Sequence, residues 1–113
     1  MRRIRASERN FLRNLYNQCK MRHARDRHVG EIVTWEVFTK SYSEQAGMCA
    51  VSGLRFDISD SSRSPSPDRI DNNVGYVPGN VQFVTWQVNN MRGSMSLHEF
   101  RDMCRVVVTW NGR

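Results

Sequence analysis

Apolar residues recur three or four positions apart near the start of the chain. This spacing is typical of one face of a helix, and it involves Phe11, Leu12, Leu15, Tyr16 and Cys19. Ser7 precedes these residues and belongs to a residue type that often caps a helix. We therefore expect a first helix that begins at Ser7, in a region that ends near Gly30.

A second helix is expected shortly afterwards. Thr34 is a suitable N-terminal cap, and Trp35, Phe38 and Tyr42 follow on one helical face. Because glycine commonly terminates helices, this helix should stop near Gly47.

The middle of the chain alternates between turn formers and short apolar runs. Residues 59–67 are rich in serine and proline and predict a loop. Residues 69–71 and 81–84 predict two short strands, joined by the turn-rich residues 72–79. Residues 85–91 then predict a short helix, which the next glycine ends.

A final helix is predicted from Ser96. Ser96 and Glu99 have the spacing of a capping box, and we expect a buried stripe of Phe100, Met103, Cys104 and Val107. The resulting order of helices, strand pair and helices predicts an α+β fold.

Composition limits the possible classes of protein. A chain of 113 residues is long enough for one domain of ordinary size. It contains no apolar run long enough to span a membrane, and Met1–Arg5 is not followed by the apolar block of a secretory signal. Three separated cysteines argue against a disulfide scaffold and favour the reducing cytoplasm.

The positive charge is concentrated at one end of the chain. Residues 1–28 contain nine basic and two acidic side chains, whereas residues 29–113 contain eight and nine. We expect the basic segment to bind the phosphates of nucleic acid, through Arg2, Arg3, Arg5, Arg9, Arg13, Lys20, Arg22, Arg25 and Arg27. A solvated helix that aids solubility and an anionic membrane surface are the alternatives.

The candidate chemistry lies in residues 66–92. Asp68 offers a charged oxygen ligand at the start of a strand, and Asn89 offers an amide oxygen on the following helix. Two such ligands leave coordination positions for water and phosphate, and all-oxygen sites favour Mg²⁺ or Mn²⁺. Spacing alone favours a different interpretation, in which Asp68 is a cap or turn residue and Asn89 is a helix-surface amide.

This stretch contains four short motifs, which are Asp68-Arg69-Ile70-Asp71, Gly75-Tyr76, Asn80-Val81-Gln82 and Asn89-Asn90-Met91-Arg92. Through these motifs, with weaker likeness at 49–53 and 95–104, the sequence resembles the phage and bacterial branch of the HNH endonuclease family. The resemblance implies a ββα-metal core, in which two strands and a helix hold one divalent cation. It divides the chain into a basic helical part at 1–47 and an HNH-like unit at 48–113, within one compact domain.

The resemblance also implies roles for individual residues. Asp68 and Asn89 would be catalytic residues that bind the metal, and Asn80 would be a catalytic-site residue that ties the loop to the strands and holds the shape of the site. Arg69 stands where the family usually has its histidine base, and arginine is too weak a base for that role. Arg69 would instead contact a phosphate oxygen or stabilise charge in the transition state, and Arg92 would contact nucleic acid. Asp71 is the nearest replacement base, and the histidines at 23, 28 and 98 are further candidates.

We therefore expect a Mg²⁺- or Mn²⁺-dependent enzyme that cuts or nicks double-stranded DNA in a bacterial cell or phage-infected host. Structural zinc is not expected, because Cys49 has no set of partner cysteines. Two alternatives remain open. One is an HNH-like protein that binds or inhibits without chemistry, and the other is a protein that binds an acidic protein partner.

Overall fold

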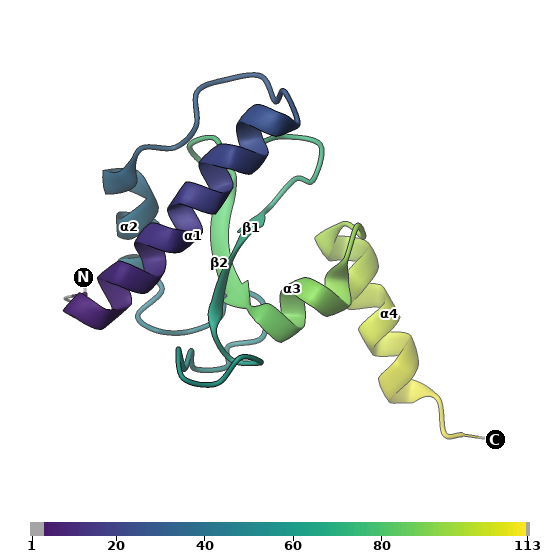
Figure 1. Cartoon of the computed structure of the whole chain (residues 1–113). Helices are drawn as coiled ribbons and strands as arrows, with labels where there is room; N and C mark the ends of the chain where they lie inside the picture. Colours follow the sequence, from purple (N-terminus) through teal and green to yellow (C-terminus); the bar gives the residue numbers. More distant parts are fainter. Residues whose placement is uncertain (1–3, 113) are drawn as a thin grey trace.

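The computed structural model describes residues 4–112, which form an α+β fold of four helices and one antiparallel strand pair. The elements follow one another as α1 (Ala6–Arg25), α2 (Trp35–Glu44), β1 (Pro65–Arg69), β2 (Val81–Thr85), α3 (Trp86–Arg92) and α4 (Leu97–Thr109). Figure 1 shows the hairpin at the centre, with α1 and α2 toward one end of the molecule and α4 toward the other.

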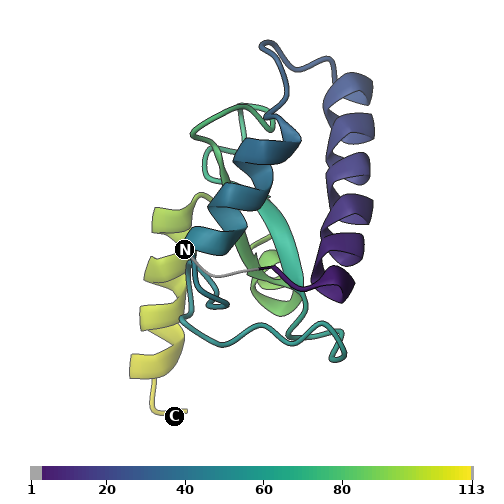
Figure 2. The ribbon, with the colours of Figure 1, turned by 90° about the vertical axis from the view of Figure 1, so that its left-hand side faces the viewer.

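The hairpin separates two apolar cores. Phe83 on β2 is buried with Leu12, Tyr16 and Phe38 from α1 and α2. The next residue, Val84, points to the other face and is buried with core residues that precede β1 or belong to α3 and α4, namely Cys49, Val88 and Phe100. Figure 2 shows this layering from the side, with α1 and α4 on opposite sides of the strands. The first core therefore joins the basic N-terminal part to the rest of the fold.

Strand β1 begins earlier than the sequence predicts. The expected loop at 59–67 gives way to a strand at Pro65, and the strand ends at Arg69, so that residues 70 and 71 lie outside it. Register explains how two prolines fit. Pro65 and Pro67 pair with Thr85 and Phe83, respectively. The backbone hydrogen bonds between the two strands are instead made by even-numbered residues, as in the bond from Ile70 N–H to Asn80 O. A proline nitrogen is tolerated on the open edge of a strand.

Helix α1 begins and ends at residues other than those expected. Its N-cap is Arg5, and Ser7 lies within the first turn. It ends well before Gly30, because Arg27 adopts a left-handed conformation with φ of 54°. The N–H groups of Arg27 and His28 then donate to Ala24 O and His23 O. This pattern terminates helices, and glycine usually holds the left-handed position.

The other helix starts confirm the sequence-based predictions. The side chains of Thr34, Thr85 and Ser96 accept N–H hydrogen bonds at the starts of α2, α3 and α4, respectively. Ser96 and Glu99 form the capping box in full. Because Thr85 is both the last residue of β2 and the cap of α3, the helix follows the strand without a loop.

The stripe predicted on α4 is only partly buried. Phe100 is buried and Cys104 is half-buried, but Met103 and Val107 are more than half exposed. The helical spacing was right, but no described element covers the second half of this face. None of the helices within residues 4–112 is both long and apolar enough to cross a membrane.

Candidate metal and nucleic-acid site

The β1–β2–α3 unit brings the two expected metal ligands to neighbouring positions. Ser66 and Asp68 are two residues apart on β1 and share one face of the strand. Asn89 and Arg92 are three residues apart on α3 and share one side of the helix. Asn89 Nδ2 donates to Ser66 Oγ at 2.7 Å, and Arg92 Nη1 donates to Asp68 Oδ2 at 2.6 Å. The helix therefore lies with this side against the face that carries Asp68.

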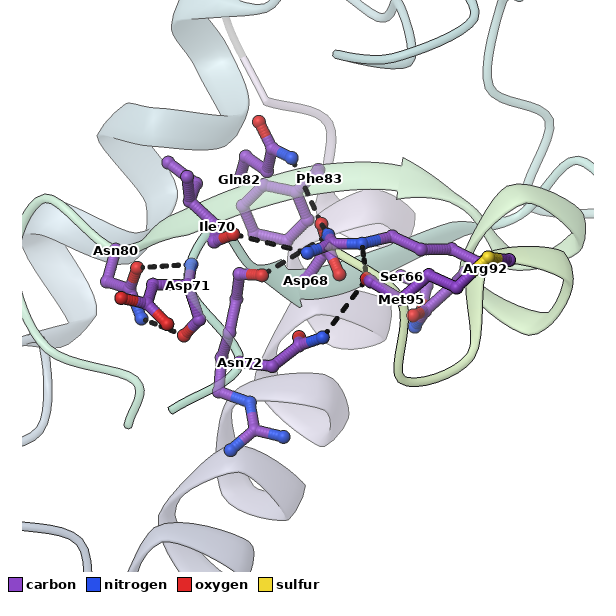
Figure 3. Close-up of polar contacts among 12 residues, drawn as sticks. Ser66, Asp68, Ile70, Asp71, Asn72, Asn80, Gln82, Phe83, Arg92 and Met95 are labelled. Atoms are coloured by element: carbon purple, nitrogen blue, oxygen red, sulfur yellow. Dashed lines mark hydrogen bonds and ion pairs between the residues drawn. The ribbon is translucent and has the colours of Figure 1, made fainter. Parts of the chain in front are cut away.

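Asp68 is buried and already has a cationic partner. Its side chain is 6% exposed, and that of Arg92 is 1% exposed. Gln82, directly opposite on β2, donates a second hydrogen bond to Asp68 Oδ2 at 3.0 Å. Figure 3 shows this group between the hairpin and the loop that carries Met95.

Arg92 was expected to contact nucleic acid, and the structure corrects that expectation. Besides Asp68, its guanidinium donates to the backbone oxygens of Arg69, Ile70 and Met95. These four bonds, with the burial of the side chain, leave Arg92 facing the protein interior. Through these bonds, the Arg92 side chain links α3 to the end of β1.

The donor atoms that remain suit a hard cation. Within residues 4–112, neither Asp68 Oδ1 nor Asn89 Oδ1 accepts a hydrogen bond from another residue. A carboxylate oxygen and an amide oxygen are the ligand types that Mg²⁺ and Mn²⁺ take in proteins. The residues thus fit such a cation, although Arg92 already neutralises the carboxylate on its other oxygen.

Asn80 organises the loop between the strands. It is buried, its Oδ1 accepts the Asp71 N–H, and its Nδ2 donates to the backbone oxygens of Asp71, Val74 and Gly75. These bonds tie residues 71–75 to the start of β2, as Figure 3 shows for Asp71. A catalytic role for Asn80 stays a prediction.

Asp71 is exposed and takes part in a turn. Its Oδ1 accepts the N–H of Asn73 at 2.9 Å, an arrangement common in turns that begin with aspartate. Its proposed role as a base stays a prediction.

Arg69 lies on the other face of β1 from Asp68, beside residues that are distant in sequence. Its Nη1 contacts His28 Nε2 at 2.9 Å, and its Cζ lies 5.4 Å from the centre of the Tyr76 ring. The structure thus brings His28 to Arg69, a residue that is distant from it in sequence. His98, by contrast, is exposed on α4 and pairs with Asp102.

The motif glycine next to Tyr76 has a packing reason. A Cβ on Gly75 would lie 2.4 Å from His23 Nδ1 and 2.7 Å from His28 Cβ. Only glycine lets the loop approach these rings so closely. The Gly-Tyr pair in the sequence marked this position, but it did not show that His23 and His28 would be the neighbours of the glycine.

The expected nucleic-acid contacts on the N-terminal segment are mostly exposed. These are Arg5, Arg9, Arg13, Lys20, Arg22, Arg25 and Arg27, whereas Arg2 and Arg3 lie outside the described residues. Some have partners: Arg13 stacks on Trp35, and Arg25 pairs with Asp26. A groove of about 240 Å³ runs between α1 and β1 and is lined by Arg22, Ser66 and Asn89, among others. It brings the basic helix next to a candidate metal ligand.

Comparison with known proteins places the chain beside one phage protein. No family model matches the chain, and no solved structure matches it. The chain is 42% identical over 52 residues to an "uncharacterized 29.0 kDa protein in dda-modA intergenic region" of Enterobacteria phage T4. The match covers 46% of this chain and 21% of that protein, so the chain spans about a fifth of the relative's length.

Proposed function

We propose that the chain is a metal-dependent HNH-type endonuclease that hydrolyses phosphodiester bonds of DNA. One observation carries the proposal: β1, β2 and α3 follow in the order of a ββα-metal core, and the contacts Asn89–Ser66 and Arg92–Asp68 place Asn89 and Asp68 on facing surfaces. The match to a phage protein is compatible with action on DNA inside a bacterial or phage-infected cell.

Asp68 and Asn89 would hold the cation through the oxygens that no described residue uses. A bound Mg²⁺ or Mn²⁺ supplies Lewis-acid stabilisation to the scissile phosphate and to the leaving oxygen. With two protein ligands, most of the coordination sphere is left to water and phosphate. Gln82 and Arg92 orient the Asp68 carboxylate by fixing its other oxygen.

The basic helix would position the DNA. Arg22 lines the same groove as Asn89, and the exposed basic residues of α1 continue from there along the helix. Phosphate contacts of this kind position a duplex without reading bases. We therefore expect weak sequence preference and strong dependence on salt.

A second candidate function is a protein that binds DNA without cutting it. The buried pair of Asp68 and Arg92 favours it, because a neutralised carboxylate attracts a cation less strongly. Arg69 in the place of the usual base favours it too. This protein would bind DNA in a salt-dependent manner and would leave it intact when Mg²⁺ or Mn²⁺ is added.

The decisive experiment compares Asn89→Ala with Asn90→Ala in plasmid cleavage with Mg²⁺ or Mn²⁺. Asn90 is the exposed amide next along the same helix, so it controls for the loss of an amide. Asn89→Ala should lose cleavage and measured Mn²⁺ binding, yet cost only about 1 kcal/mol of stability through the Ser66 bond. If pure wild-type protein leaves DNA intact, the enzyme proposal fails. Equal cleavage by both variants would refute the site.

A further inference from the structure

Two arginine side chains meet at one buried tyrosine near the end of α1. Arg22 Nη1 donates to the Tyr76 hydroxyl at 3.0 Å, and Arg69 Cζ lies 5.4 Å from the centre of the same ring. Tyr76 is 2% exposed, so it is a fixed support for both. Both guanidinium groups also lie close enough to Cys19 to oppose the rise of its pKa that burial causes.

Neither guanidinium is neutralised. Across residues 4–112, the ion pairs involve other cations, and neither Arg22 nor Arg69 is within ion-pair distance of a carboxylate. Asp26 interacts electrostatically with both arginines, but it is exposed and is bonded to Arg25. Like charges that the fold holds together without a counter-ion repel each other, and an anion between them relieves that repulsion.

A histidine completes the cluster. The left-handed Arg27 turns the chain back after α1, so that His28 contacts Arg69 at 2.9 Å. Because Arg69 always donates, His28 Nε2 accepts in this contact. The charged and titratable groups that face His28 are Arg69 from β1 and His23 and Asp26 from the end of α1.

His23 holds the cluster together without being available to a ligand. Its Nδ1 accepts the Tyr76 N–H at 3.3 Å, and its Nε2 donates to Gly30 O at 2.9 Å. Both nitrogens are therefore used, and the ring is buried. His28 is only half-buried, and its ring lies 5.7 Å from that of His23.

We propose that Arg22, Arg69 and His28 form a binding site for one phosphodiester group of a nucleic-acid strand, on the opposite face of β1 from Asp68. The inference rests on the proposed function in taking nucleic acid as the ligand. The phosphate oxygens accept from the free N–H groups of both arginines. The His28 ring borders the site beside Arg69 and, as the Nε2–H tautomer, donates to a phosphate oxygen instead of accepting from Arg69.

The test measures binding of a short DNA duplex in EDTA, where cleavage plays no part. The salt dependence of the binding constant is compared for wild type, Arg22→Gln, Arg69→Gln and Arg105→Gln. Arg105 is an exposed arginine on α4 with its own carboxylate partner, so it is the matched control. Each of the first two variants should flatten the slope of log K against log salt by about 0.9, the value for one phosphate contact. Unchanged slopes in both would overturn the site.

The role of His28 is tested by substitution in the same assay. His28→Ala should lower the binding constant for the duplex, whereas His98→Ala, an exposed control on α4, should leave it unchanged. An unchanged binding constant in His28→Ala would overturn the role of His28. Because all arms run without metal, a protein that binds DNA in this way but never cuts it would refute the proposed enzyme and leave this site standing.

Discussion

The buried pair of Asp68 and Arg92 should be strongly coupled in stability. We expect Asp68→Leu and Arg92→Met each to lower the free energy of unfolding by about 3–5 kcal/mol, because each leaves one charge buried without its partner. A chain of 113 residues has a total stability of roughly 6–17 kcal/mol. Each single variant should therefore fold, with its urea midpoint lower by about 2 M.

The double variant removes both charges at once. Its cost should be near 2–4 kcal/mol, since the backbone oxygens of Ile70 and Met95 lose their donor but remain within reach of water. The sum of the single effects is about 6–10 kcal/mol, so the cycle should give a coupling energy of at least about 2 kcal/mol. The assay is urea unfolding followed by circular dichroism for all four proteins.

An exposed pair on α4 gives a matched control. Arg105 and Asp102 have the same 2.6 Å contact, but their side chains are 69% and 53% exposed. The same cycle there should give a coupling energy below about 1 kcal/mol. Additive effects at Asp68 and Arg92, within about 0.5 kcal/mol, would refute the reasoning that burial makes this pair matter. The result also shows how much of any lost activity in Asp68 variants is lost folding.

Three further predictions concern the loop and the first core. Gly75→Ala should destabilise the fold by about 1–3 kcal/mol in urea unfolding, because its Cβ would overlap the His23 ring; wild-type stability would contradict the close approach. Asn80→Asp should be more destabilising than Asn80→Ala, because a carboxylate oxygen would face three backbone oxygens; the reverse order would reject the assigned bonds. Burial raises the pKa of Cys19 from 9.0 to about 12, so the unfolded thiol ionises first and stability should fall by about 1.4 kcal/mol per pH unit above pH 9. The Cys19→Ala variant should not show this loss of stability above pH 9. Identical pH profiles of stability for the variant and the wild type would contradict the prediction.

Local patterns were sufficient to predict that the four helices exist, although not the residue at which α1 begins. The caps at Thr34 and Ser96 and the spacing of Leu12, Tyr16 and Cys19 depend only on neighbours along the chain, and each is found as predicted. The helix after β2 also follows from local signals. The resemblance named the candidate site, because Asp68, Asn80 and Asn89 belong to one short motif.

Local patterns gave wrong predictions where residues that are distant in sequence determine the structure. Prolines at 65 and 67 indicate a loop by composition, yet the edge of the hairpin accepts them. The apolar residues of α4 have the spacing of a buried stripe, but burial requires a covering element, and Met103 remains exposed. In both cases, the outcome depends on which other parts of the fold pack against the residue.

The charged residues of the candidate site show most clearly the difference between what the sequence predicts and what the folded chain decides. By sequence alone, Arg92 and Arg69 are both basic residues suited to phosphate, since charged side chains usually face solvent. Tertiary structure buries Arg92 against Asp68, whereas Arg69 lies beside His28 and Tyr76 and has no ion pair within residues 4–112. The sequence determined which charges the chain carries and which helices it forms. Only the folded chain determined which charges are paired, because burial and pairing depend on contacts between segments that are up to 54 residues apart.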